Sequence, residues 1–148
     1  MPRFLRFTFF ALLACLLTGP VSASADEDVN QITHLLKSTF DRPDAPLHAA
    51  PVVVVANHAI ADWSQDERGG RALLRQHHGS WSIVLCSGDA LKDEKFLNDA
   101  GVPSADALAL AKALAEAETD VTPERLAQFS LFDGTVRMDE GGEHGSHP

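Results

Sequence analysis

The chain has 148 residues, 45% of them hydrophobic, which is enough to form a single domain with its own core. Its 21 acidic residues outnumber its 12 basic residues, so the formal net charge is −9 at pH 7. Such a charge repels nucleic acid and anionic membrane surfaces and attracts cations, which excludes nucleic-acid binding as a function.

The N-terminus has the pattern of a secretory signal peptide. Arg3 and Arg6 form a short positively charged region, residues 7–17 are almost entirely apolar, and residues 23–25 (Ala-Ser-Ala) match the small-residue cleavage site. The apolar run is too short to form a stable transmembrane helix. We therefore expect cleavage directly after this site and export of residues 26–148 into an oxidising compartment.

An alternative interpretation of this segment is a bacterial lipoprotein signal. Residues 12–15 (Leu-Leu-Ala-Cys) loosely match a lipoprotein cleavage box, but two leucines follow Cys15, where a processed lipid anchor normally meets small or polar residues. The organisation that we predict is therefore a signal peptide (1–25), a single domain (26–139) and a flexible His-containing tail (140–148).

The first element expected in the domain is a helix over residues 28–40. Asp26 or Asp28 is a natural N-cap for this helix. Three prolines within residues 41–51 then predict an extended connection. The apolar residues that indicate the helix recur at helical spacing: Val29, Ile32, Leu35, Leu36 and Phe40.

Four strand-like segments follow this connection. Short breaks rich in turn-forming residues separate them, which favours hairpins and therefore an antiparallel meander. The predicted strands cover residues 52–55, 58–64, 71–76 and 81–86.

After the fourth strand the pattern becomes helical. Asp89 is a suitable cap for a helix that ends at Gly101. Ser104 opens an alanine-rich helix to about Glu118, and Pro123 suits the first turn of a third helix. The predicted fold class is therefore α+β: an N-terminal helix, a four-stranded antiparallel β-meander and about three C-terminal helices packed on one face, followed by a disordered tail.

Three histidines fall at one end of the predicted sheet. In a meander the first and third turns lie at the same end; His58 follows the first turn, and His77 and His78 belong to the third. Strand spacing of about 4.8 Å places these turns within roughly 10 Å of each other. The imidazoles could share a copper or zinc ion. The alternative is that His77 and His78 are solvated turn residues and that His58 pairs with a carboxylate.

The C-terminal segment is a second candidate metal site. Met138, His144 and His147 bring a thioether and two imidazoles into a short stretch that also contains carboxylates. Thioether favours Cu(I), and imidazole accepts both oxidation states of copper. The alternative is a solvated tail that binds no metal.

Cys86 is the third candidate. Removal of Cys15 with the signal peptide would leave Cys86 without an intramolecular partner, as a buried packing residue, a metal ligand or a reactive thiol. The meander places it at the end of the sheet opposite His58, His77 and His78, so no imidazole is available there as a base. Because no H-E-x-x-H, C-x-x-C or G-x-S-x-G motif is present either, we expect no enzymatic activity.

Several segments together carry a family resemblance. They are residues 58–65 (HAIADWSQ), 69–75 (GGRALLR), 85–89 (LCSGD), 101–103 (GVP) and 132–139 (FDGTVRMD). The chain resembles the copper uptake system-associated proteins, small periplasmic proteins of Gram-negative bacteria, over about Ile32 to Asp139. The resemblance implies a periplasmic role beside copper importers and copper-carrying proteins, but no defined set of ligands. Tails in this family can be much richer in histidine than the one found here.

The sequence and the resemblance together predict a periplasmic accessory protein that binds copper or hands it to an inner-membrane importer or a periplasmic carrier protein. The candidate ligands form two groups, a sheet-end site of His58, His77 and His78 and a flexible site of Met138, His144 and His147. One alternative is a non-metal interaction module that docks on a membrane transporter partner. Another is a thiol-dependent enzyme centred on Cys86.

Overall fold

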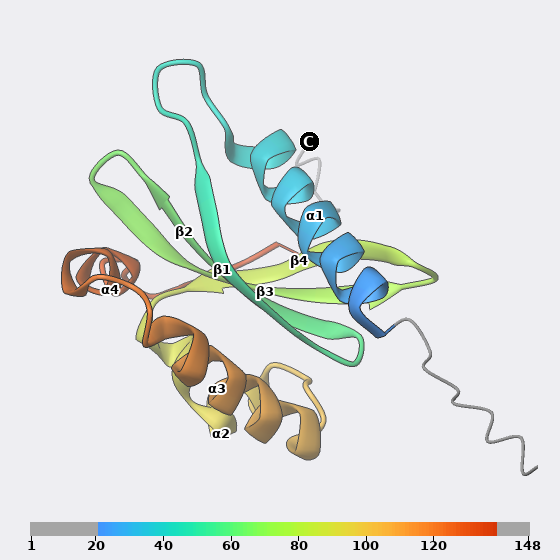
Figure 1. Cartoon of the computed structure of the whole chain (residues 1–148). Helices are drawn as coiled ribbons and strands as arrows, with labels where there is room; N and C mark the ends of the chain where they lie inside the picture. Colours follow the sequence, from blue (N-terminus) through green and yellow to red (C-terminus); the bar gives the residue numbers. More distant parts are fainter. Residues whose placement is uncertain (1–20, 139–148) are drawn as a thin grey trace, which may run out of the picture.

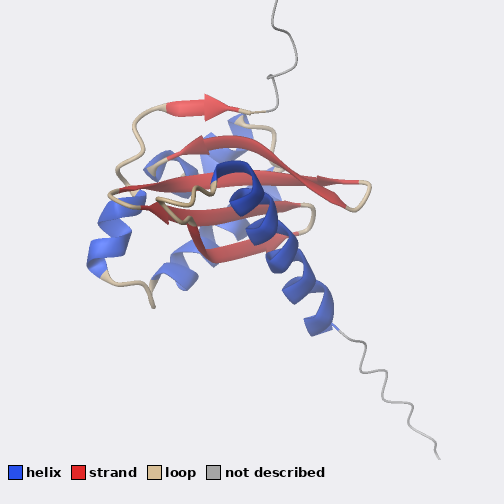
Figure 2. Ribbon diagram, turned by 90° about the horizontal axis from the view of Figure 1, so that it is seen from above, coloured by secondary structure: helices blue, strands red, loops and turns tan. Residues whose placement is uncertain are grey.

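A five-stranded antiparallel sheet forms the centre of the protein, and helices cover both of its faces (Figures 1 and 2). The computed structural model describes residues 21–138. The strands lie in the sheet in chain order, so the predicted α+β class and antiparallel sheet are confirmed. The elements are α1 (Val21–Phe40), β1 (His48–Val55), β2 (His58–Gln65), β3 (Arg68–His77), β4 (Ser80–Ser87), the 3₁₀ helix η1 (Asp89–Lys92), α2 (Glu94–Asp99), α3 (Ser104–Glu118), α4 (Pro123–Phe129) and β5 (Thr135–Arg137).

The fifth strand is a departure from the prediction of four. β5 pairs with β4, and Cys86 lies opposite Val136 in this pair. Because β5 has only three residues, its alternation is too short to be visible in the sequence. It exists as a strand through its pairing with β4, which no local pattern reveals.

Two-residue turns join the first four strands. Ala56, Asp66 and His78 begin these turns, with φ angles of 51–52°. This left-handed conformation is the one that tight hairpins require. The backbone N–H of Gln76 donates to the carbonyl oxygen of Asn57 (2.8 Å), so the first and third turns lie at the same end of the sheet, as the meander predicts.

One face of the sheet packs against α1. Ile32 and Leu36 of this helix are fully buried. Every second residue of a strand points to the same face of the sheet. On the face beneath α1, several of these residues are small, among them Ala59, Ala61 and Ala72. Small side chains let the helix approach the sheet closely.

The start of α1 differs from the prediction. The helix begins at Val21, so the predicted N-cap role of Asp26 or Asp28 is wrong. The Asp28 carboxylate instead accepts hydrogen bonds from Trp81 Nε1 (2.9 Å) and Gln76 Nε2 (3.1 Å). These two bonds fix α1 to β3 and β4.

The opposite face of the sheet packs against α2 and α3. Alternate residues of the same strands, such as Ile60 and Leu73, form a second core with Leu97 of α2 and with Leu110 and Leu114 of α3. The helices therefore lie on both faces, with α1 on one and α2 and α3 on the other (Figure 2). Of the helices between residues 21 and 138, none has the length and apolar composition needed to cross a membrane.

The segment from 89 to 101 forms two short helices instead of the single helix predicted. The Asp93 carboxylate accepts a hydrogen bond from the backbone N–H of Phe96 (2.8 Å), so it caps a new helix, α2, directly after η1. α3 and α4 begin at the residues expected from the sequence.

Two adjacent glycines let the last turn of α4 and the chain after it pass closely around the end of the sheet. A Cβ atom on Gly69 would lie 2.6 Å from the Gln128 carbonyl oxygen, and one on Gly70 would lie 2.9 Å from Phe132 Cβ. Because neighbouring strand residues point to opposite faces, Gln128 and Phe132 lie on opposite sides of the sheet. Phe132 packs edge-on against Trp63 on the α1 side, with the ring centroids 5.9 Å apart.

Candidate functional site

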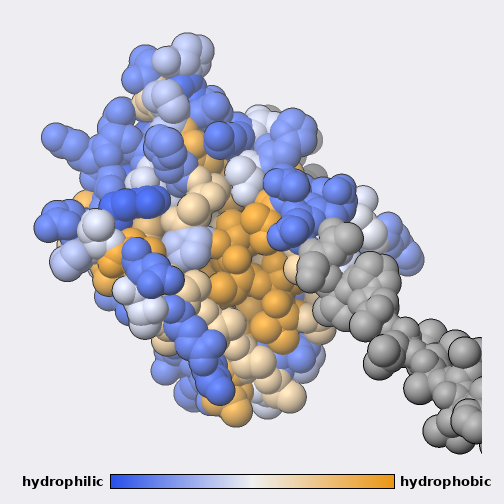
Figure 3. Space-filling view, in the orientation of Figure 1, coloured by the Kyte–Doolittle hydropathy of each residue, from blue (hydrophilic) through white to orange (hydrophobic). Residues whose placement is uncertain are grey.

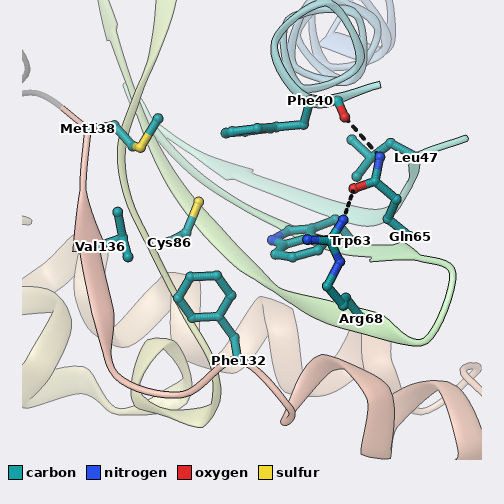
Figure 4. Close-up of a pocket in the computed structure, with 9 residues that line it drawn as sticks. All are labelled: Phe40, Leu47, Trp63, Gln65, Arg68, Cys86, Phe132, Val136 and Met138. Atoms are coloured by element: carbon teal, nitrogen blue, oxygen red, sulfur yellow. Dashed lines mark hydrogen bonds between the residues drawn. The ribbon is translucent and has the colours of Figure 1, made fainter. Parts of the chain in front are cut away.

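A cavity of about 250 Å³ lies on the α1 side of the sheet, at the C-terminal end of that helix (Figure 4). The end of α1, the segment before β1, the strands and the C-terminal segment all contribute to its walls. Most of the lining is apolar. The apolar side chains are Phe40, Leu47, Trp63, Phe132 and Val136.

Two polar side chains close one side of this cavity. Gln65 is buried, and its Nε2 donates to the carbonyl oxygens of Phe40 (2.8 Å) and Ala45 (2.7 Å). Arg68 donates to Gln65 Oε1 (3.2 Å). Gln65 therefore ties the connection between α1 and β1 to the sheet, and its hydrogen-bonding groups are satisfied without a ligand.

Cys86 lies in the wall formed by β4. Its side chain is buried, and this burial raises the pKa of the thiol to about 11. The thiol is therefore neutral at pH 7, and none of the residues from 21 to 138 that line the cavity is a histidine. A neutral thiol without a neighbouring base is a poor nucleophile.

Met138 lies in the same cavity as Cys86. Its backbone N–H donates to the Val84 carbonyl oxygen (2.8 Å), which continues the pairing of β5 with β4 by one residue. Since Val136 lies opposite Cys86, Met138 is a diagonal cross-strand neighbour of Cys86, about 7 Å away in a regular sheet. Figure 4 shows both sulfur-bearing side chains on the same side of the cavity, away from Arg68.

His58 is placed where the sequence predicts, but its side chain is buried. Its Nδ1 lies 3.9 Å from Asp106 Oδ2 of α3. Burial lowers the pKa of His58, the Asp106 carboxylate opposes this effect, and the nearby Arg75 and His77 add to it. Arg75 is also the cross-strand partner of His58, so a cationic side chain lies beside the imidazole.

His77 and His78 lie at the same end of the sheet as His58 and are exposed. Between residues 21 and 138, no three His, Cys, Asp or Glu side chains lie close enough together to form a site for a metal ion. Coordination of one metal ion by His58, His77 and His78 together stays a prediction. His144 and His147 lie outside the described residues.

The structure contains a cluster of buried charged residues on the α3 side of the sheet, which the sequence analysis does not predict. Its centre is Arg71, which is fully buried and donates to Glu118 Oε1 from Nε (3.0 Å) and from a terminal nitrogen (2.6 Å). The other terminal nitrogen donates to Asp89 Oδ1 (3.0 Å), and the guanidinium lies over the Phe129 ring. Lys92 forms a further ion pair with Glu118 (3.2 Å).

Asp62 completes this cluster and is fully buried. Its carboxylate lies 3.4 Å from Arg71 Nε but receives no hydrogen bond from the described part of the chain. Burial raises the pKa of Asp62 to about 7; the Arg71 charge opposes this and the neighbouring Glu118 adds to it. The register across the β2–β3 hairpin pairs Asp62 with Arg71, so the sequence contains this signal. It contains none for Glu118, which is 47 residues from Arg71 in sequence.

Comparison with protein-family models, with curated proteins and with solved structures gives no match to this chain.

Proposed function

We propose that this protein is a periplasmic accessory protein of a copper uptake system, which binds copper ions and hands them to an inner-membrane importer or a periplasmic carrier. One observation carries the proposal: Cys86 and Met138 line the same apolar cavity, and the segment with His144 and His147 follows Met138 directly in sequence. The resemblance of the chain to the copper uptake system-associated proteins supports the same function.

The chemistry of this cavity favours Cu(I) over divalent ions. Thiolate and thioether are soft ligands, which Cu(I) prefers. When Cu⁺ binds Cys86 it displaces the thiol proton, so that the thiol and Cu⁺ give a neutral copper thiolate and a released proton. A divalent ion in the same place would leave a net positive charge among apolar side chains, which is costly. The apolar lining would therefore favour Cu⁺ over divalent metal ions.

The position of Met138 suits transfer of the ion. Met138 is 37% exposed as a residue, whereas Cys86 is 5% exposed. An ion bound by both residues would thus have a protected ligand on the sheet and an accessible ligand at the surface. In this proposal, His144 and His147 supply outer ligands that capture the ion or receive it.

The sheet-end histidines are a weaker basis for the same function. Arg75 lies beside His58, and a fixed positive charge opposes the binding of a cation there. His77 and His78 are exposed and would hold an ion only loosely. We therefore place the principal site at Cys86 and Met138.

The test is a Cu(I) titration under anaerobic conditions in competition with a colorimetric Cu(I) chelator. We expect Cys86→Ala and Met138→Leu each to weaken binding by about tenfold or more, which corresponds to about 1.4 kcal/mol. Val136→Ala is the matched control, because it removes a lining side chain without removing a ligand. Truncation after Asp139 measures the contribution of His144 and His147.

Two results would overturn the proposal. One is a native protein that binds Cu(I) no more tightly than about 10 μM, since a carrier needs higher affinity than that. The other is binding that Cys86→Ala and Met138→Leu both leave unchanged. If only the His77→Ala/His78→Ala double variant lost Cu(I) binding, the copper site would lie at the sheet end instead of at Cys86 and Met138.

A further inference from the structure

The outer edge of β1 is an open strand edge. Among the strands of residues 21–138, β1 pairs only with β2, so the main-chain groups on its other side have no strand partner. The side chains of Val52–Val55 are all partly exposed along this edge. Figure 3 shows an apolar patch over β1, between α1 and α3. An exposed apolar strand edge is a template for pairing with another strand.

The free part of this edge is short and sharply bounded. The register between β1 and β2 shifts between Ala49 and Val52, and Pro51 has no N–H to donate. Arg125 of α4 donates to the Ala50 carbonyl oxygen (3.2 Å), so the start of the strand is already occupied. The segment left for a partner is Val52–Val55.

The composition of this segment fits a second copy of the same chain. β1 contains no charged residue, so two β1 strands meet without like-charge repulsion even though the chain carries a net charge of −9. In an antiparallel pair related by a twofold axis, directly opposed side chains point to the same face. With Val53 on the axis, Val53 would face its own counterpart on the α3 side, and Val52 of each copy would face Val54 of the other copy on the α1 side.

The opposite edge of the sheet is a poorer template. β5 has three residues and ends in Arg137, and a short charged edge strand resists pairing. The two edges thus differ in length and in charge. We infer that two copies of this chain associate through antiparallel pairing of Val52–Val55, which joins their sheets into one continuous sheet.

The experiment is light scattering of the purified protein, expressed from its full sequence, during size exclusion over a dilution series. The native protein should have the mass of two chains at high concentration and approach the mass of one chain on dilution. Val53→Lys should weaken dimerisation by about tenfold or more, because a charge on an edge strand blocks pairing. Val136→Lys, the same change on the other edge strand, should leave it intact.

A second measurement does not depend on any variant being folded. Hydrogen exchange of the native protein should show backbone amides in Val52–Val55 that become protected as the concentration rises. A native protein that stays a single chain at every concentration overturns the inference. So does a dimer that Val136→Lys dissociates and Val53→Lys does not, or a dimer whose β1 amides exchange equally fast at all concentrations.

Discussion

Asp62 and Arg71 lie opposite each other in the β2–β3 pair, both fully buried, with Asp62 Oδ1 3.4 Å from Arg71 Nε. Arg71 directs its hydrogen bonds to Glu118, Asp89 and the Phe129 carbonyl oxygen, and none to Asp62. Asp62 and Glu118 thus lie beside the same guanidinium, and Glu118 has a second cation in Lys92, whereas no group in the described residues donates a hydrogen bond to Asp62. Burial raises the pKa of Asp62 to about 7, so this carboxyl group holds its proton over a wider pH range than an exposed one does.

The first prediction concerns the pH dependence of folding. The pKa of Asp62 is raised from 3.8 to about 7 in the folded protein, so between these values the folded state holds a proton that the unfolded state has lost. The stability that this group contributes is fully present below about pH 4 and is lost as the pH rises to about 7. The slope for one proton is about 1.4 kcal/mol per pH unit.

Asp62→Asn isolates this effect, because the amide imitates the protonated carboxyl at every pH. We expect the free energy of unfolding of the variant, relative to the native protein, to increase as the pH rises from about 4 to about 7. Urea denaturation at a series of pH values measures this difference. A difference that does not change with pH would show that Asp62 is ionised in the folded protein.

The second prediction concerns Arg71. Arg71→Met removes the guanidinium that pairs with Glu118 and lies against Asp62, and leaves Lys92 as the cation paired with Glu118, which costs about 3–5 kcal/mol of the free energy of unfolding. Arg42→Met is the control, since the Arg42 pair with Asp44 is long (3.9 Å) and exposed. Chemical denaturation should show less than about 0.5 kcal/mol for the control. Equal effects of the two substitutions would contradict this account of the cluster.

The third prediction concerns the reactivity of Cys86. Because the thiol is buried and its pKa is raised to about 11, iodoacetamide should alkylate the native protein much more slowly than the urea-unfolded protein. Mass spectrometry of the peptide that contains Cys86 measures both rates. The rate of the native protein should keep rising above pH 9. Fast alkylation at pH 7 in the native state would mean that the cavity is open to solvent.

The fourth prediction concerns the attachment of α1 to the sheet. Asp28→Ala removes the acceptor of the Trp81 and Gln76 hydrogen bonds and should cost about 1–2 kcal/mol of stability. Asp28→Asn keeps an acceptor oxygen and should recover much of this loss. Thermal and urea unfolding compare the two variants. If both variants were equally destabilised, the negative charge of Asp28 rather than its hydrogen bonds would fix the helix.

The fold is predictable where the pattern is local. α3 is a long helix between clear start and stop signals, and its bounds follow from the sequence. The hairpins follow from short breaks between apolar runs. β5 does not, because three residues become a strand only through pairing with β4. The helix predicted from 89 to 101 fails because the Asp93 side chain caps a second helix within it.

The candidate site is predictable only in part for the same reason. The meander correctly places His58, His77 and His78 at one end of the sheet, but it does not determine that His58 points into the core while the other two are exposed. The proximity of Cys86 and Met138 depends on β5, so it could not be inferred without that strand. The link between Arg71 and Glu118 joins β3 to α3 and leaves no trace in either local pattern.

The path of the chain past Gly69 and Gly70 has a mechanical consequence. Residues 128–132 reach around the rim of the sheet, so that Phe129 is held among the charges under α3 while Phe132 is held against Trp63 under α1. Because this short segment packs on both faces of the sheet, α1 cannot easily separate from the sheet while α3 stays packed, or α3 while α1 stays packed. Both cores should consequently melt together, as one cooperative unit.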